Sequence, residues 1–156
     1  ICTLGTAIRA AGAPEAFRAI DYEAVIAFAT AALAAGASQF IVVTAVGASP
    51  SASIFYSRIK GEVERDLADL GFARLDIVRP GLLLGKRAER RPVESLLQTL
   101  APVTDCLMLG PWRQYRSVDA RDLAHYLLAL TSHAAPGIFT HYFDEIHAHT
   151  AGATCR

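Results

Sequence analysis

Apolar residues recur at intervals of three and four along three stretches of the chain, and this spacing predicts helices. The stretches are residues 15–35, 54–70 and 119–131. Gly36 and Gly71 follow the first two and are suited to end them, and Asp119 is a candidate N-cap for the third. A shorter helix is expected over residues 93–100, after a charged loop at residues 86–92.

Short apolar runs, rich in β-branched residues, lie between these helices and predict strands. They are residues 1–4, 40–45, 75–78 and 138–143, with a short extended piece at 115–118. Because strands alternate with helices, the pattern predicts βα units and a parallel sheet with helices on both faces. The expected fold class is therefore α/β, a doubly wound, Rossmann-like parallel sheet.

The chain opens directly in an apolar run, Ile1-Cys2-Thr3-Leu4. This start suggests the later half of a longer domain, of about four strands, whose first strand has an edge meant for missing neighbours. Residues 1–156 are expected to form this portion of one domain, with no second domain. Residues 146–156 contain few apolar side chains and are expected to be a loose tail.

Composition narrows the classes of function. Fifteen basic and fifteen acidic side chains cancel, so no overall field attracts nucleic acid or an anionic membrane, and no apolar run has the length of a membrane span. Three scattered cysteines favour reduced thiols and a cytoplasmic location. The five histidines, including the solvated pair His147 and His149, have no metal-ligand spacing, so no metal is expected.

Tyr56 and Lys60 are one helical turn apart and lie on the same face of the helix expected at 54–70. An ammonium beside a phenol favours the phenolate and lowers the tyrosine pKa. Such a tyrosine can exchange a proton with a carbonyl or alcohol oxygen. The pair is expected on an exposed helix face that opens on a cleft at the carboxyl ends of the strands.

Three expected strands end in residues suited to a ligand site, because ligands of doubly wound sheets bind at the carboxyl ends of the strands. These ends are Leu4-Gly5-Thr6, Thr44-Ala45-Val46-Gly47-Ala48 and Arg79-Pro80-Gly81. Arg79 is expected to form a structural ion pair with Asp76 or Asp122. Trp112 is suited equally to the wall of a substrate pocket and to the core.

This combination resembles the short-chain dehydrogenase/reductase superfamily, which binds NAD(P) on a Rossmann fold. Four segments look like its atypical branch that includes the Tat-interacting protein and its bacterial relatives. They are residues 2–6, 55–62, 78–84 and 116–124, and the resemblance covers roughly residues 1–145.

The resemblance implies a role for each matching residue. Tyr56 would be the acid/base, Lys60 would contact the nicotinamide ribose, and a hydroxyl near Thr44 would polarise the substrate. The cofactor would also contact Leu4, Gly5, Thr6, Pro80 and Gly81. NADP is the expected cofactor, with NAD also open, and the partner is a small-molecule substrate, with a homo-oligomer possible in principle.

Two departures from the family pattern leave alternatives open. The glycine-rich pyrophosphate loop would lie upstream of Ile1, and the family's serine falls nearer Ala45 than Thr44. The polarising hydroxyl is then lost, or is supplied by Thr44, Ser49 or Ser51. The leading interpretation is an NADP(H)-linked oxidoreductase. The alternatives are a cofactor-binding regulatory or scaffold protein without turnover and, less favoured, a sugar-nucleotide epimerase.

Overall fold

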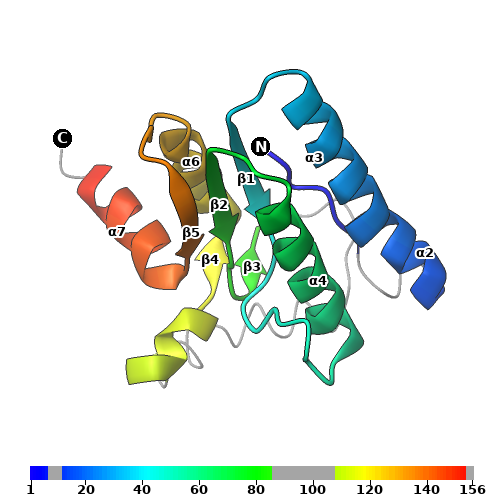
Figure 1. Ribbon diagram of the computed structural model, residues 1–156. Coiled ribbons are helices and arrows are strands. Elements are labelled where there is room, and N and C mark those ends of the chain that lie inside the picture. Colours follow the sequence, from blue (N-terminus) through cyan, green and yellow to red (C-terminus); the bar gives the residue numbers. More distant parts are fainter. Residues whose placement is uncertain (7–11, 86–107, 154–156) are drawn as a thin grey trace.

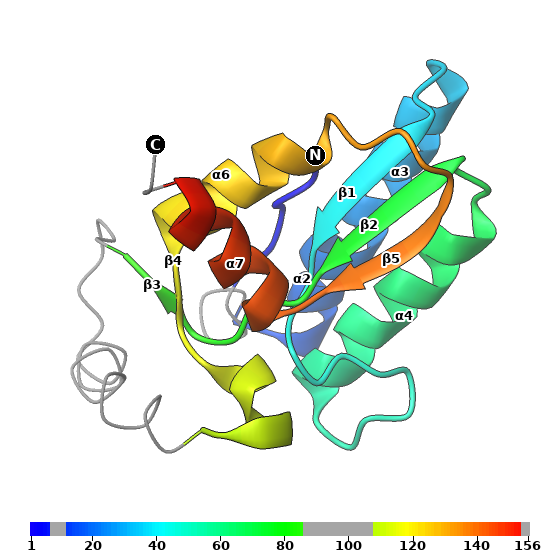
Figure 2. The same cartoon turned by 90° about the vertical axis from the view of Figure 1, so that its left-hand side faces the viewer.

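A computed structural model describes residues 1–6, 12–85 and 108–153 of the chain (Figure 1). The main sheet has three parallel strands in the order β1-β2-β5, where β1 is Gln39–Val43, β2 is Arg74–Val78 and β5 is Gly137–His141. Cys2 extends the sheet beside β1 through a parallel bridge to Val42. Figure 2 shows the three strands running in one direction, so their carboxyl ends share one edge. The α/β fold class is confirmed.

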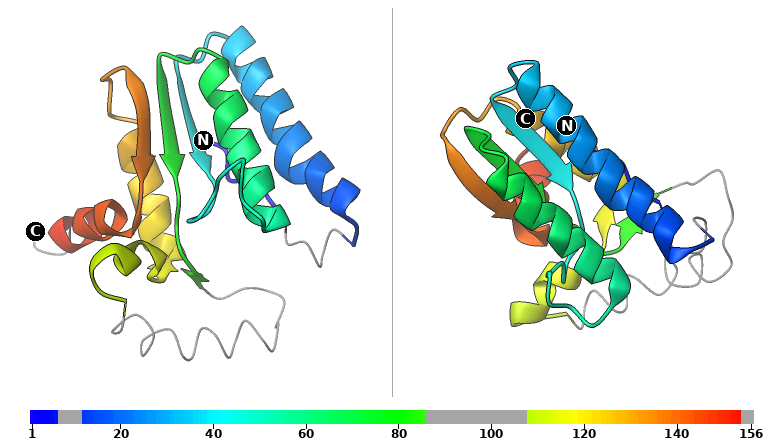
Figure 3. Two further views of the ribbon diagram at one scale, coloured as in Figure 1. Left: turned by 60° about the horizontal axis from the view of Figure 1, so that its bottom comes forward. Right: turned by 45° about the vertical axis from the view of Figure 1, so that its right-hand side comes forward.

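Helices cover both faces of this sheet (Figure 3). On one face lie α4, Phe55–Asp69, and a continuous helix made of α2, Pro14–Arg18, η1, Ala19–Glu23, and α3, Ala24–Ala34. On the other face lie α6, Ala120–Leu130, and α7, Phe143–Ala153. The sheet is therefore enclosed between two helical layers, as the alternation of strands and helices predicted.

The side chains of β1 point alternately to the two faces of the sheet, where they belong to two separate hydrophobic clusters. Phe40 and Val42 pack with Val25, Val63 and Leu67 of α3 and α4. Ile41 points to the opposite face, into a second cluster from α6 and α7. Successive side chains of a strand point to opposite faces, so a strand that is buried on both sides reads as the continuous apolar run seen in the sequence.

A smaller parallel pair, β3 at Leu83–Leu84 and β4 at Val118–Asp119, follows the end of β2. The 3₁₀ helix η2, Gly110–Tyr115, precedes β4. The turn at Gly81 packs on this segment so closely that a Cβ there would lie 2.3 Å from the Arg116 carbonyl oxygen. The absence of a side chain at Gly81 thus fixes where η2 meets the edge of the sheet.

Several predicted elements differ from the structure. The strand expected at residues 1–4 is reduced to the Cys2 bridge, and Tyr115 ends η2 instead of lying in an extended piece. The loose tail expected from residue 146 is wrong through residue 153, because α7 buries Ile146 and stacks His147 on Phe143. Among the described residues the main sheet has three strands and the Cys2 bridge, against about four strands expected. The predicted loop at 86–92 and helix at 93–100 lie outside the described residues.

Across the ranges that the structure describes, no helix has both the length and the apolar character of a membrane span.

Candidate active site

Tyr56 and Lys60 occupy the first two turns of α4, next to the end of β1. The loop from β1 reaches this helix through a close approach at Gly61, where a Cβ would lie 2.1 Å from the Ser49 carbonyl carbon. The backbone of Ser49 also donates its N–H to the Ser57 carbonyl, at 3.1 Å. The loop therefore lies directly on the helix and places Tyr56 at the carboxyl edge of the sheet.

Lys60 is buried, and its ammonium lies 2.8 Å from Oδ1 of Asp21 in an ion pair. The Asp21 residue has no exposed surface and the Lys60 residue is 5% exposed. The expectation of an exposed Tyr56/Lys60 face is therefore wrong for Lys60. Its charge is held between α4 and the η1 turn because a buried ammonium needs an opposite charge beside it.

Asp21 has a second contact, with the end of the first apolar run. Its Oδ2 accepts a hydrogen bond from the Thr6 backbone N–H at 2.7 Å. A Cβ at Gly5 would lie 3.0 Å from Oδ1 of Asp21 and 3.4 Å from Nζ of Lys60. Gly5, Thr6, Asp21 and Lys60 thus come together at one point, of which the sequence analysis had named all but Asp21.

The position of Asp21 along its helix was the signal that could have revealed it. Phe17, Asp21 and Val25 are spaced by four, so a carboxylate interrupts the stripe that faces the core. Asp21 also lies in η1, a single turn of π-helix, and such turns often mark functional sites.

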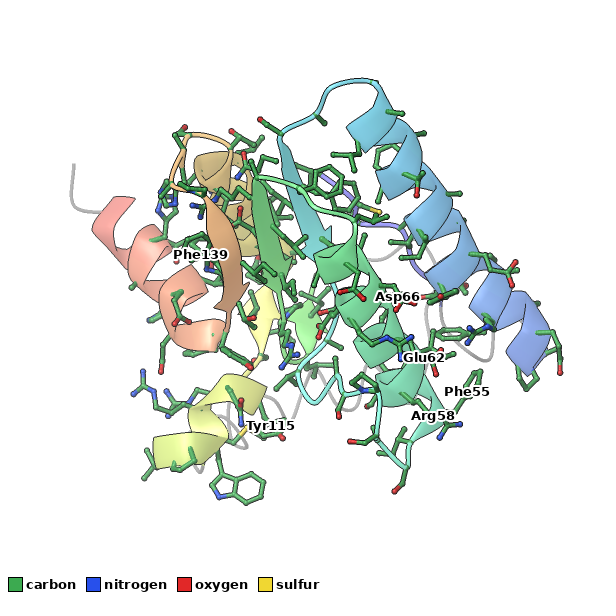
Figure 4. The ribbon with its side chains drawn as sticks, in the orientation of Figure 1. Phe55, Arg58, Glu62, Asp66, Tyr115 and Phe139 are labelled. Carbon is green, nitrogen blue, oxygen red and sulfur yellow. The ribbon has the colours of Figure 1, made fainter. Side chains whose placement is uncertain are left out.

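The helices that carry Asp21 and Lys60 are tied together along their outer sides. Glu62 accepts a hydrogen bond from Arg18 at 2.7 Å, and Asp66 accepts one from the Tyr22 hydroxyl at 2.5 Å. Figure 4 shows Glu62 and Asp66 on the side of α4 that faces α2 and α3. The Arg58/Glu62 and Lys60/Glu64 pairs favoured by i,i+4 spacing do not occur, since each acidic member bonds to a different element.

The Tyr56 pKa is raised, first by burial of the phenol and then by the negative charge of Asp21. The ring of Phe17 lies 5.8 Å from the Tyr56 ring, centroid to centroid, and forms part of this apolar cover. The lowered pKa expected from Lys60 is therefore not found, because Asp21 offsets the ammonium charge. At neutral pH this tyrosine holds its proton.

Thr44 is 5% exposed, and its hydroxyl donates to Oε1 of Glu64 at 2.5 Å. Glu64 also pairs with Arg79, whose Nε lies 3.0 Å from Oε1 and whose Nη2 lies 2.5 Å from Oε2. Arg79 donates as well to the hydroxyl of Tyr142, at 2.9 Å. Arg79 thus forms a structural ion pair as expected, but with Glu64 and not with Asp76 or Asp122.

The other candidate hydroxyls bond to each other. The Oγ atoms of Ser49 and Ser51 lie 3.0 Å apart in the loop before α4. Ala45, the residue nearest to the serine position implied by the family resemblance, is half-buried. Among the candidates for polarising a substrate, the structure therefore places Thr44 in a hydrogen bond with a buried carboxylate and the two serines near the surface.

The remaining named residues lie along the same edge of the sheet. The buried Pro80 accepts a hydrogen bond from the Val46 N–H at 3.1 Å, which joins the ends of β1 and β2. Leu4 is 44% exposed beside Gly5. Trp112 is 67% exposed on η2 and contacts Tyr115, so it is not a core residue. In the parts of the chain with a described structure, no three His, Cys, Asp or Glu side chains are grouped to hold a metal.

The chain is similar to fungal proteins named FMP52, mitochondrial. It is 36% identical to the Coccidioides immitis protein over 123 residues, 78% of this chain and 50% of that protein. It is 36% identical to the Aspergillus fumigatus protein over 141 residues, 88% of this chain and 60% of that protein. With FMP52-1 of Scheffersomyces stipitis the identity is 41% over 97 residues, 62% of this chain and 42% of that protein. No protein-family model matches.

The chain spans about half the length of the curated relatives that it matches, between 42% and 60% of these three. Their names correct the cytoplasmic location expected from the cysteines, because each is called mitochondrial. Scattered reduced cysteines are compatible with more than one compartment and did not distinguish them. The similarity is thus to the mitochondrial FMP52 proteins, and the Tat-interacting branch in particular stays a prediction.

Proposed function

We propose that this chain is part of an NADP(H)-linked oxidoreductase of the short-chain dehydrogenase/reductase type that acts on a carbonyl or alcohol. The observation that carries the proposal is the cluster of Tyr56, Lys60 and Asp21 at the carboxyl edge of a parallel sheet. Ligands of this class of fold bind at that edge. The sequence resemblance around Tyr56 and Lys60 supports the same chemistry.

The residues around Lys60 suit a dinucleotide in two respects. The absence of a side chain at Gly5 leaves the Lys60 ammonium uncrowded, because a Cβ there would lie 3.4 Å from Nζ. An ammonium has three hydrogens, and its contact with Asp21 is an ion pair, so Lys60 keeps donors for a ribose hydroxyl. When bound, the nicotinamide would supply or accept the hydride. Gly5, Thr6 and Lys60 would hold it, and Tyr56 would hold the proton for the substrate oxygen.

A second function, cofactor binding without turnover, is favoured by the state of Thr44. Its hydroxyl has one proton, and that proton is donated to Glu64. Ala45 has no hydroxyl at the position expected for the polarising serine. The developing negative charge on a substrate oxygen would then be met by Tyr56 alone, which slows the reaction or abolishes it.

The test is NADPH oxidation by the full-length protein against a panel of aldehydes, ketones and quinones, with NADPH titration of each variant. Tyr56→Phe should lower turnover by about 10²–10⁴-fold and leave cofactor affinity nearly unchanged, because its hydroxyl acts on the substrate. Lys60→Ala should lower both turnover and cofactor affinity. Tyr22→Phe is the matched control, since its hydroxyl bonds Asp66 on the outer side of the helix pair. Tight NADPH binding with no turnover on any substrate would favour the binding function.

The names of the relatives lead us to place the full-length protein in mitochondria. Cell fractionation with an antibody to the native protein tests this. Recovery of the protein in the cytosol, with mitochondrial markers absent from that fraction, would contradict it.

A further inference from the structure

Asp21 is a buried acidic group in contact with the proposed reacting pair through Lys60. It has no exposed surface, its Oδ2 accepts the Thr6 N–H at 2.7 Å, and its Oδ1 lies 2.8 Å from the Lys60 ammonium. The ammonium has the distance of an ion pair but not the direction of a hydrogen bond, so Oδ1 accepts none from the described residues. Asp21 is thus the ion-pair partner of Lys60, and its Oδ1 keeps an unused acceptor site.

Several other charged side chains of α2 and α4 already have partners among the described residues. On α2 and α4, Arg18 bonds to Glu62, and Glu64 bonds to Arg79 at the end of β2. Arg58, on the first turn of α4, donates to the Ala52 carbonyl at 3.2 Å. The stretch from Ser49 to Ile54 has no charged residue. Asp21 and Lys60 are thus the buried charges of this cluster, and Asp21 raises the pKa of Tyr56 after burial of the phenol.

We propose that Asp21 is a positioning residue that holds and neutralises Lys60, so that Tyr56 acts as a protonated acid and the site favours carbonyl reduction. This inference rests on the function proposed above. The geometry supports it because the carboxylate lies 2.8 Å from the ammonium, on a helix that Arg18 and Tyr22 tie to α4. The raised pKa of Tyr56 agrees with this role, because it favours the protonated phenol.

The proposed step balances with a reduced nicotinamide dinucleotide as co-reactant. Its hydride, with both electrons, adds to the carbonyl carbon, and the π electron pair of the C=O bond moves to the oxygen. That oxygen takes the proton of the Tyr56 hydroxyl, which leaves an alcohol, the oxidised dinucleotide and a phenolate. The phenolate regains a proton from water. A tyrosine without Asp21 would ionise at lower pH and would instead serve alcohol oxidation, which needs a base.

The experiment measures the ionisation of Tyr56 directly, in the full-length protein labelled with ¹³C at the tyrosine Cζ, with Tyr56→Phe identifying the signal. Asp21→Asn should lower the Tyr56 pKa by about one unit, because Lys60 is left uncompensated. Lys60→Met should raise it, because Asp21 is then left alone. In the double variant, which carries Asp21→Asn and Lys60→Met, the Tyr56 pKa should return close to the wild-type value. Glu23→Gln, an exposed carboxylate two residues along the same helix, is the matched control and should not move it.

Opposite shifts in the two single variants support the proposal, because a structural role would not give opposite signs. An unchanged or raised Tyr56 pKa in Asp21→Asn overturns it. If the single variants do not fold, the double variant removes both buried charges together, and a shift in it of more than about one unit overturns the proposal. The NMR titration needs no substrate, so it succeeds or fails independently of the turnover assay. Where turnover exists, the high-pH limit of reduction should move down with Asp21→Asn.

Discussion

The hydroxyl of Thr44, directly after β1, donates a 2.5 Å hydrogen bond to the carboxylate of Glu64 on α4. The same carboxylate of Glu64 accepts a hydrogen bond from Arg79 at the end of β2. Arg79 in turn donates to the hydroxyl of Tyr142, which follows β5. Thr44 is thereby part of a series of buried and partly buried contacts that joins three strand ends to α4. Because Thr44 is engaged in this way, its neighbour Ala45, near which the family resemblance places a polarising serine, is the position to test for that hydroxyl.

Ala45→Ser should raise turnover by about tenfold or more if the protein reduces carbonyl compounds, because the new hydroxyl would donate to the developing oxyanion. Cofactor affinity should change little. The measurement is kcat for NADPH oxidation on the best substrate of the panel, with Ala52→Ser, in the loop before α4, as the control that adds a hydroxyl elsewhere. A variant that binds NADPH like wild type and gains no activity would favour the binding function.

Glu64→Ala should lower the free energy of unfolding by about 2–4 kcal/mol, because it leaves the partly buried Arg79 guanidinium and the Thr44 hydroxyl without their acceptor. Chemical denaturation measures this change. Glu62→Ala is the matched control on the same helix. It breaks a more exposed pair with Arg18, for which the cost should stay below about 1 kcal/mol. Equal losses in the two variants would contradict the assigned role of Glu64.

The order of strands and helices could be predicted from the sequence because it depends on local spacing. Helical periodicity predicted α4 and α6, and Asp119 caps α6 by accepting from the Arg121 N–H as expected. The beginning of α7 was missed because its first residue, Phe143, was assigned to the strand expected at 138–143. Phe143 and Ile146 anchor that helix in the core, and without Phe143 the remaining pattern is not distinguishable from a tail.

The candidate site could be predicted only in its local part. Tyr56 and Lys60 share a helix, so their spacing was informative. Asp21 is far from Lys60 in the sequence, and only the packing of two helices brings them together. For the same reason the sequence predicted the sign of the Tyr56 pKa change wrongly, because it showed the ammonium but not the carboxylate that offsets it.

Gly61→Ala should destabilise the protein and displace Tyr56, because the added Cβ would lie 2.1 Å from the Ser49 carbonyl carbon and 2.3 Å from the Pro50 nitrogen. Backbone cannot yield as a flexible side chain can, so we expect a loss of about 1–3 kcal/mol in the free energy of unfolding. Gly85→Ala is the matched control, since its Cβ meets only the Ala120 Cβ, at 3.3 Å. Thermal or chemical unfolding of both variants tests the difference, and a harmless Gly61→Ala would show that the loop does not hold α4 in place.

The last prediction concerns the buried polar network on the opposite face of the sheet. Asp76 is fully buried and accepts hydrogen bonds from Arg74 and Gln39, and its Oδ1 lies 2.9 Å from Nε2 of His141. The hydroxyl of Tyr126 lies 2.8 Å from Nδ1 of the same histidine. Burial, and then the charges of Glu145 and Asp76, raise the pKa of Tyr126 to about 12.

The folded state therefore binds the Tyr126 proton more tightly than the unfolded chain does. Its contribution to stability is fully present below the unfolded pKa of about 10 and is lost as the pH rises toward 12. The full loss is roughly 2 kcal/mol, most of which falls above pH 10. Wild type should lose stability over this range, as followed by urea unfolding.

Tyr126→Phe should be less stable at pH 7 but should lose less between pH 9 and 11, because it has no phenol to ionise. Tyr56 is present in both proteins, so its own titration cancels in the comparison. Tyr115→Phe removes an exposed phenol and is the matched control. Its free energy of unfolding should fall between pH 9 and 11 as much as that of wild type. Parallel pH profiles for wild type and Tyr126→Phe would mean that the phenol is not protected by the network, and the hydrogen bond to His141 would then contribute little to holding α6 on β5.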